Sequence, residues 1–235
     1  MVAGASTIMQ TITPQDLHLS SMPAVTQKAF LSCVELDFFS RSGWYLAGGT
    51  ALALQVGHRV SVDLDFFTTA PDFDADQIER ELSKRGEWVT TLREEGTLYG
   101  IFQGAKMSFI AYPSFRPSDD GLQCQSVRLV LPKDIAAMKI MAVSQRGKKR
   151  DFFDLYWLAQ NGISLETALL GALKQYGERH HSLPHFLKSL VYFTDAEDDA
   201  MPEIFFQADW KTVKKFFETE VPSLAKKLLQ LPSST

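Results

Sequence analysis

Apolar and polar positions divide the chain into two differently patterned halves. Up to about residue 131, short apolar stretches of strand length are mixed with helical spacing. After Pro132, apolar residues recur at the three- and four-residue spacing of amphipathic helices. We therefore predict an α+β fold, with a mixed β-sheet flanked by helices over residues 14–131 and a helical C-terminal domain packed on it over residues 132–235.

The same patterns predict the individual elements. The first dozen residues are small and polar, and we expect them to be frayed. The helices expected in the first half are 24–39, 51–56 and 74–85, and the strands are 44–47, 60–67, 88–92, 98–103, 106–112 and 127–131. The second half is expected to hold helices 134–145, 151–160, 165–176, 185–193 and 211–231.

Composition is that of an ordinary soluble protein. The chain has 235 residues, of which 45% are apolar and 22% charged. No stretch reaches the roughly 18 apolar residues needed to span a bilayer, and the first residues lack the pattern of a signal peptide. We expect a cytoplasmic protein with no membrane partner. Cys33 and Cys124 have no metal-ligand spacing, so we expect them to be small buried residues.

The net charge of −4 does not indicate a nucleic-acid-binding protein, but charge is unevenly placed. The segment from Lys139 to Arg150 has five basic residues and no acid, whereas Asp195 to Glu203 has five acids and no base. The basic residues Arg146, Lys148, Lys149 and Arg150 lie around a predicted turn. They are either solvated surface residues or, together with Lys139, groups that neutralise a triphosphate or hold the backbone of a nucleic acid.

A pair of carboxylates lies in the predicted strand 60–67. Side chains alternate along a strand, so Asp63 and Asp65 should share one face while Leu64 and Phe66 point into a core. Two carboxylates at that spacing can hold one divalent cation such as Mg²⁺. The alternative is a polar face in water, although aspartate is unfavourable in strands and like charges on one face repel.

A glycine turn precedes the acids by about a dozen residues. Gly48-Gly49-Thr50 separates a predicted strand from a predicted helix, an arrangement that lets a phosphate approach the free N–H groups of a helix start. Thr50 could cap that helix or bind a phosphate oxygen. By alternation, Arg59 and Ser61 lie on the face of Asp63, where Arg59 either pairs with an acid or contacts a phosphate.

The motifs, in this order, resemble the AbiEii/AbiGii toxin family of DNA polymerase beta-like nucleotidyltransferases. The resemblance spans roughly residues 44–160. It rests on Tyr-Leu-Ala-Gly-Gly-Thr, on Arg59-x-Ser61-x-Asp63-Leu64-Asp65, on the helix that carries Lys139, and on Arg150-Asp151-x-x-Asp154-Leu155.

The resemblance implies a metal-dependent nucleotidyltransferase that is a toxin-like component of a bacterial toxin–antitoxin or phage-defence system. Such an enzyme would transfer NMP from an NTP to an acceptor, with the 3′ end of tRNA expected, and would have a cognate antitoxin as partner. Gly48, Gly49 and Thr50 would bind the triphosphate, beside Arg59 and Ser61. Asp63 and Asp65 would hold Mg²⁺ (or Mn²⁺), and Lys139 and Asp151 would complete the catalytic site. The RNA would contact Arg146, Lys148, Lys149 and Arg150.

One position departs from the family pattern. The wider superfamily usually carries a third carboxylate on a nearby strand, but residues 106–112 contain no acid and Ser108 stands where one would be expected. Either Asp151 takes over as the third acid or base, or activity is reduced or lost. Two alternatives to the transferase remain open, the first of them suggested by this acid-free strand. One is a catalytically inactive module that binds a nucleotide or a partner, and the other is a phosphotransferase that acts on a protein or small molecule.

Overall fold

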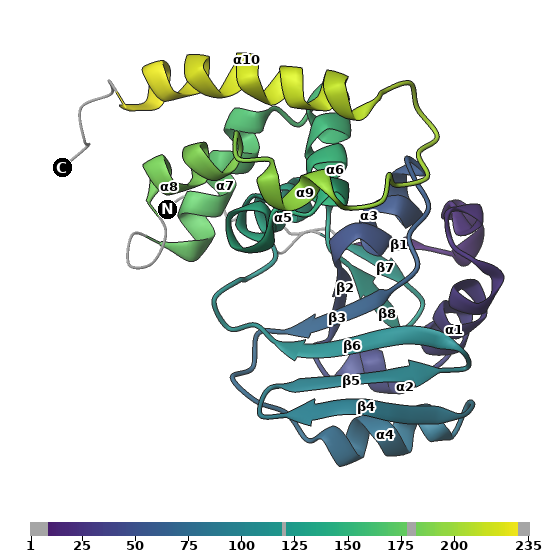
Figure 1. The fold of residues 1–235 in the computed structure, drawn as a ribbon. Helices are drawn as coiled ribbons and strands as arrows, with labels where there is room; N and C mark the ends of the chain where they lie inside the picture. Colours follow the sequence, from purple (N-terminus) through teal and green to yellow (C-terminus); the bar gives the residue numbers. More distant parts are fainter. Residues whose placement is uncertain (1–8, 119–120, 178–181, 230–235) are drawn as a thin grey trace. The chain divides into compact units, whose positions relative to one another are not determined.

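The chain divides into two compact units, residues 1–131 (unit 1) and residues 132–235 (unit 2). The computed structural model describes residues 9–118, 121–177 and 182–229 (Figure 1). The predicted α+β class is confirmed, because unit 1 is built on a mixed sheet with helices and the regular elements described in unit 2 are helices. None of the described helices is both long and apolar enough to cross a membrane.

Unit 1 is organised around one eight-stranded sheet. Its strands lie in the order β1 (Gln10–Ile12), β7 (Leu122–Cys124), β8 (Val127–Leu129), β2 (Tyr45–Ala47), β3 (Leu64–Thr68), β6 (Ala105–Ala111), β5 (Thr97–Phe102) and β4 (Trp88–Glu94). The pairs β1–β7, β2–β8 and β3–β6 are parallel, and the other neighbours are antiparallel. The sheet is therefore mixed, and β3 lies in its interior between β2 and β6.

Alternation along β3 places its apolar side chains in the core, as predicted. Leu64 and Phe66 are fully buried, whereas Asp65 and Phe67 are partly exposed. The ring of Phe66 stacks on Phe109 of β6 with centroids 5.4 Å apart. One face of the strand is thus anchored by aromatic packing, and this anchoring holds Asp65 on the opposite face.

Helices of unit 1 differ from the prediction mainly at their ends. They are α1 (Ala24–Val34), α2 (Asp37–Arg41), α3 (Gly48–Val56) and α4 (Ala75–Ser83), with short 3₁₀ turns at Pro14–Asp16 and Leu19–Ser21. The single helix predicted over 24–39 is wrong, because the chain breaks at Glu35–Leu36 between α1 and α2. Asp74 caps α4 by accepting a hydrogen bond from the amide of Gln77 at 3.1 Å.

The first residues also differ from the prediction. Residues 10–12 were expected to be frayed, but they form β1, which pairs with β7, a strand that the patterns did not indicate. The rest of that prediction, for residues 1–8, lies outside the described residues. Each of these strands has only three residues, too few to show an alternating pattern, and their pairing is a contact between distant segments.

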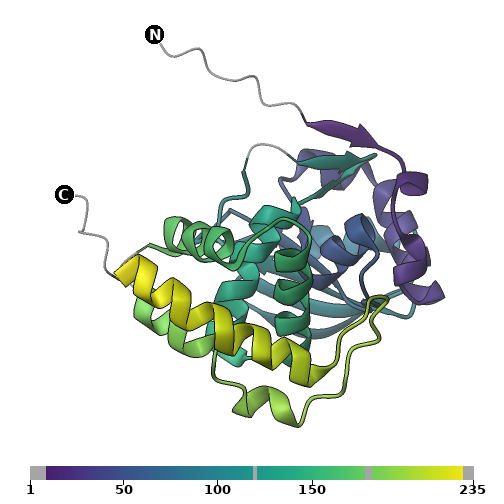
Figure 2. The ribbon, with the colours of Figure 1, turned by 90° about the horizontal axis from the view of Figure 1, so that it is seen from above.

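Unit 2 is built from α5 (Pro132–Arg146), α6 (Lys149–Gln160), α7 (Leu165–Tyr176), α8 (Leu183–Ser189), α9 (Thr194–Glu197) and α10 (Trp210–Leu229). Helix α5 packs against α6, α7 and α8, and α10, the long helix of Figure 2, packs against α6 and α8. The aromatic core of unit 2 is formed by the rings of Phe152, Phe193, Trp210 and Phe217. The helix predicted over 185–193 is present as α8, but it begins two residues earlier and ends at Ser189, followed by a turn. The last residues of the helix predicted over 211–231 lie outside the described residues.

Both cysteines are buried free thiols, as expected. Burial raises the pKa of Cys33 well above its usual range, and burial, with a smaller effect of the Asp16 charge, raises the pKa of Cys124 to about 11. Because a thiolate is the reactive form, neither thiol is suited to nucleophilic or metal chemistry near neutral pH.

Candidate functional site

Register across three strands positions the glycine segment beside Asp65. Asp65 of β3 lies opposite Ala47, the last residue of β2, and opposite Ser108 of β6. Helix α3 begins at Gly48, directly after Ala47. The glycines and Asp65 are therefore neighbours although they are far apart in the sequence.

The carboxylate of Asp65 faces Ser108 with one oxygen and the glycines with the other. Ser108 Oγ donates a 2.6 Å hydrogen bond to Asp65 Oδ1. Asp65 Oδ2 lies 3.4 Å from the position that a Cβ atom on Gly48 would occupy. Gly48 has φ +71°, a conformation that favours glycine, so this residue both starts α3 and leaves room beside the carboxylate.

Asp63 precedes β3 and is held through its backbone. The predicted strand over 60–67 is too long at its start, since β3 begins at Leu64. The hydroxyl of Thr50 donates to the carbonyl oxygen of Asp63 and is bonded to Ser61 Oγ at 2.8 Å. The proposed role of Thr50 as a helix cap is wrong, because the cap position is Ala47. Thr50 instead ties the first turn of α3 to the segment that carries Asp63.

Arg59 fills the space next to Gly49. A Cβ atom at Gly49 would lie 2.2 Å from Nη2 of Arg59 and 3.4 Å from Ser61 Oγ. The guanidinium is nearly fully buried and donates through Nη1 to the carbonyl oxygen of Val60 at 2.8 Å. The glycine thus makes possible the close approach of a cation to the start of α3. A phosphate bound there would meet this guanidinium as well as the helix N–H groups.

Gly49→Ala is therefore expected to push Arg59 away from α3 and to weaken nucleotide binding at least tenfold, since a lost charged hydrogen bond costs about 1.5–3 kcal/mol. The control is Gly43→Ala, where φ is +71° but nothing lies within 4 Å of the added atom. That variant should lose some stability and retain nucleotide affinity. Titration calorimetry with an NTP checks both, and equal affinities in the two variants would contradict the proposed role of Gly49.

The two acids are a suitable donor set for a cation shared with a nucleotide. Among the described residues, no group of three or more His, Cys, Asp or Glu side chains is arranged to hold a metal ion by itself. Mg²⁺ is usually bound by one or two carboxylates together with substrate phosphates. Asp65 beside the glycines, with Asp63 two residues before it, fits that pattern.

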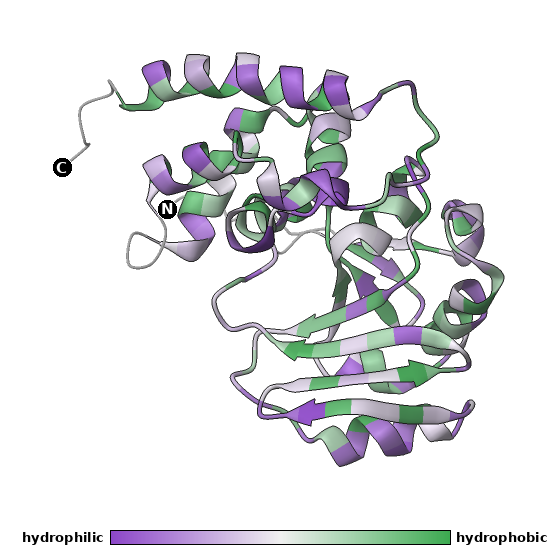
Figure 3. Ribbon diagram, viewed as in Figure 1, coloured by the Kyte–Doolittle hydropathy of each residue, from purple (hydrophilic) through white to green (hydrophobic). Residues whose placement is uncertain are grey.

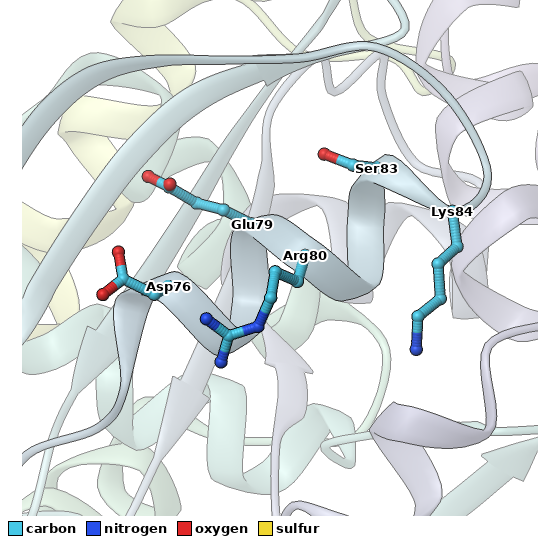
Figure 4. A pocket seen from close by; sticks show the side chains of 5 residues that line it. All are labelled: Asp76, Glu79, Arg80, Ser83 and Lys84. Atoms are coloured by element: carbon cyan, nitrogen blue, oxygen red, sulfur yellow. The ribbon is translucent and has the colours of Figure 1, made fainter.

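The hollow in Figure 4 lies elsewhere. Its lining residues come from α4 and from Lys84, which directly follows that helix, and all are polar or charged: Asp76, Glu79, Arg80, Ser83 and Lys84. A second hollow is lined by residues from Ala24 to Glu35. Neither contains a residue of the glycine segment or the acid pair. Both are open surfaces of helices, and we assign them no ligand.

Lys139 and Asp151 form a buried ion cluster in unit 2. Nζ of Lys139 lies 2.6 Å from Asp151 Oδ1 and 2.7 Å from Asp154 Oδ2, and both aspartates are fully buried. Arg146, which is half exposed, reaches Asp151 Oδ2 at 3.4 Å. The cluster joins α5 to α6. The spacing of Asp151 and Asp154, three residues apart on α6, places them on one helical face, but it does not by itself indicate that both bind Lys139.

The basic residues at 146–150 differ from one another in burial and in their partners. The amine of Lys149 is nearly buried and donates to the carbonyl oxygens of Glu197 and Asp199, so it is not available to a phosphate in this structure. Lys148 pairs with Asp199 at 3.1 Å and is half exposed. Arg146 and Arg150 keep exposed side chains.

Asp199 caps α6 from a distant segment. Its Oδ2 accepts from the amide of Lys149, the first residue of α6, at 2.9 Å. Burial opposes ionisation of Asp199, but the Lys149 amide and the Lys148 amine outweigh it, and the pKa of Asp199 lies below its usual range. A carboxylate at a helix start is stabilised by the free N–H groups and the helix dipole. The complementary basic and acidic runs in the sequence were the signal that could have indicated this contact.

This cap gives a pH-dependent prediction. Because the folded pKa is lowered, the stabilisation is complete above the unfolded pKa of about 3.9 and is lost as pH falls through the folded pKa. The amide oxygen of asparagine can still cap the helix, so Asp199→Asn removes only the charge and should lower the free energy of unfolding by about 0.3–1 kcal/mol at pH 7. Its difference from the parent protein should shrink below pH ~4. Urea unfolding at pH 7 and pH 3 measures this, with the exposed neighbour Asp198→Asn as control. A difference that is unchanged at pH 3 would refute the cap.

Known proteins resemble this chain in sequence and in fold. A family model described as nucleotidyl transferase AbiEii toxin, type IV TA system, matches residues 29–100 and 105–231. An uncharacterised protein of Aquifex aeolicus (strain VF5) is 36% identical over 182 residues, which are 76% of this chain and 86% of that protein.

Two solved structures share the fold. One is MenT4, a nucleotidyltransferase toxin from Mycobacterium tuberculosis H37Rv, with a TM-score of 0.54, 15% identity, and coverage of 92% of this chain and 88% of that chain. The other is a candidate nucleotidyltransferase from H. pylori, with a TM-score of 0.52, 17% identity, and coverage of 88% and 97%. At these identities the likeness concerns the fold.

Proposed function

The chain belongs to the nucleotidyl transferase AbiEii toxin family of type IV toxin–antitoxin systems, and we propose that it transfers a nucleoside monophosphate from an NTP to the 3′ end of an RNA, with tRNA as the acceptor. The observation that carries the proposal is the position of Asp65 Oδ2 beside Gly48, at the start of α3. A carboxylate next to free helix N–H groups suits a cation-bound triphosphate and disfavours a bare anion.

In this proposal the residues of unit 1 bind the nucleotide. The first turn of α3, with Gly48 and Gly49, receives the phosphates, and Arg59 offsets their charge from its position over Gly49. Thr50 and Ser61 keep the backbone of Asp63 in place through their hydrogen bonds. Ser108 fixes one oxygen of Asp65 and leaves the other toward the glycines.

The chemistry is an in-line displacement. The acceptor hydroxyl oxygen forms a bond to the α-phosphorus while the bond to the bridging oxygen of the β-phosphate breaks. Pyrophosphate leaves, and the hydroxyl proton passes to water. Mg²⁺ or Mn²⁺, held by Asp63 and Asp65 with the phosphates, would supply stabilisation of the charge on the attacking and leaving oxygens. The protein's residues contribute positioning and charge complementarity.

Lys139 and Asp151 serve this function as positioning residues. Both are buried and paired with each other, so a direct role of Lys139 in phosphate binding would require the cluster to open. We assign them to holding α5 against α6. Arg146, Lys148 and Arg150 remain the proposed contacts for the RNA backbone, and a cognate antitoxin is the proposed protein partner.

One observation favours an alternative. Ser108 lies directly opposite Asp65, where a third carboxylate would strengthen a metal site, and it donates to Asp65 rather than to a cation. A module that binds the nucleotide but does not transfer it would tolerate this replacement. The alternative and the main proposal differ in turnover, and an assay therefore separates them.

The test is transfer itself. The purified protein is incubated with Mg²⁺, each α-labelled NTP in turn and total tRNA, beside Asp63→Ala. We expect label in tRNA that depends on Mg²⁺ and is absent with Asp63→Ala. Nucleotide binding without transfer would replace the proposal by the inactive module. Label on protein or on a small molecule would replace it by a phosphotransferase.

A further inference from the structure

The row of side chains that contains Asp65 continues across the sheet to its edge. Asp65 lies opposite Ser108, Ser108 opposite Tyr99 of β5, and Tyr99 opposite Leu92 of β4. Residues paired in register point to the same face of a sheet. Tyr99 and Leu92 therefore lie on the face that carries the acid, two and three strands away from it.

This face is apolar and exposed along its outer strands. Tyr99 is 39% exposed, Leu92 37%, Ile101 38% and Val89 48%, and Val89 is paired with Ile101. We call these four residues the outer patch. Lys106 is opposite Ile101 on β6, is exposed, and brings a positive charge to the same face. Figure 3 shows apolar positions on β4 and β5 as well as on the inner strand β6.

The opposite face of the same strands is fully packed. Leu98, Phe102 and Phe109 are completely buried there. The ring of Phe39 in α2 stacks at 6.3 Å from Phe109, and α4 packs against β4 (Figure 1). At β4 and β5 the sheet thus has one face that completes the core of unit 1. Its other face exposes large apolar side chains. Exposed aromatic and aliphatic side chains in one group are typical of binding surfaces.

We propose that the outer patch binds the single-stranded 3′ end of the RNA acceptor, with a base stacked on the ring of Tyr99 and a phosphate at Lys106. The inference rests on the proposed function, and it adds where the acceptor lies. Base stacking on an aromatic ring next to a basic side chain is the usual way in which proteins hold single-stranded nucleic acid. The occupant is a strand of RNA because the row leads to Asp65, the proposed ligand of the ion that stabilises charge on the attacking 3′ oxygen.

The dimensions agree with a short single strand. Neighbouring strands are about 4.8 Å apart, so Tyr99 is roughly 10 Å from Asp65. Stacked nucleotides advance about 3.4 Å each, and the distance corresponds to about three of them. A protein partner needs more surface, because a stable interface uses about 20–30 residues on each side. Four exposed apolar side chains are too few for that and sufficient for one or two bases.

The test measures RNA binding and nucleotide binding separately. The probe is a 5′-labelled single-stranded oligoribonucleotide of about a dozen residues with a free 3′ hydroxyl, roughly four times the three-nucleotide span. Tyr99→Ala should weaken its binding about 5- to 150-fold, while Tyr99→Phe, which keeps the ring, binds as the parent protein does. Lys106→Gln should reduce the slope of log affinity against log salt by about 0.7. The matched control is Tyr192→Ala, an exposed tyrosine of unit 2, which should change nothing.

A cross-link locates the contact. The same oligomer with 5-iodouridine near its 3′ end should join to residue 99 on irradiation in the parent protein and in Tyr99→Phe, which keeps an aromatic ring, and should not in Tyr99→Ala. If Tyr99→Ala leaves RNA affinity unchanged while the parent protein transfers nucleotides to RNA, the outer patch is not the acceptor site. If Tyr99→Ala changes self-association, measured by light scattering, but leaves RNA affinity unchanged, the patch is an interface between copies of the chain. That result overturns the proposal. If Tyr99→Ala loses RNA binding although no transfer occurs with any NTP, the patch stands and the proposed function fails.

Discussion

Asp65→Asn is expected to reduce nucleotide transfer roughly 1,000-fold or more while leaving the fold intact. Loss of one carboxylate removes the anionic ligand nearest to the glycine segment. Stabilisation by a correctly held metal ion amounts to several kcal/mol, and each 1.36 kcal/mol is a factor of ten in rate. Asparagine has the same shape, and its carbonyl oxygen can still accept the hydrogen bond from Ser108.

The measurement is the single-turnover rate of label transfer at saturating NTP and Mg²⁺. The control is Asp37→Asn, an aspartate of the same unit that is 76% exposed and paired with Arg41. It should retain the parent rate, because an exposed ion pair contributes at most about 1 kcal/mol to stability. A rate for Asp65→Asn within tenfold of the parent protein would remove Asp65 from the site.

Lys139→Met is expected to destabilise the protein strongly. It leaves Asp151 and Asp154, both fully buried, without the cation that lies 2.6 and 2.7 Å from them. Breaking a buried ion pair by removing one partner costs about 3–5 kcal/mol, which for a chain of this size lowers the melting temperature by roughly 6–20 °C. The half-exposed Arg146 can compensate only in part, because its distance to Asp151 is 3.4 Å.

Calorimetry at pH 7 measures this loss. The matched control is Lys174→Met, an exposed lysine of α7, which should melt within about 2 °C of the parent protein. Replacing Lys139, Asp151 and Asp154 together by apolar residues should recover most of the stability, since the desolvation of three charges is then avoided. If Lys139→Met melts at the parent temperature and yet loses transfer, the lysine acts on substrate and the positioning role is wrong.

Local sequence patterns correctly predicted the side-chain directions in β3, the part of the site that lies in one continuous segment. Two-residue alternation predicted that Leu64 and Phe66 enter the core and Asp65 faces away from it, and the structure agrees. The pattern did not locate the start of β3, because an extended chain before a strand has the same alternation as the strand itself. It also read Gly48-Gly49-Thr50 as a separate turn, whereas these residues are the first turn of α3.

Contacts between distant segments could not be read from spacing. Nothing local to Ser108 indicates that it faces Asp65, since that follows from the parallel pairing of β6 with β3. Asp199, which caps α6, is also far from that helix in the sequence, although the basic and acidic runs indicated that the two segments could attract each other. In each case the partner is chosen by how strands and helices pack, which depends on the whole core.

The central claim is that Asp63, Asp65 and the glycine start of α3 share one divalent ion with the phosphates of a nucleotide. A crystal structure with Mn²⁺ and a non-hydrolysable NTP analogue tests it most directly, because anomalous scattering identifies the ion. We expect one Mn²⁺ ligated by both carboxylates and by phosphate oxygens, with the triphosphate at the first turn of α3. A triphosphate bound elsewhere, or an ion that contacts neither carboxylate, would contradict the account.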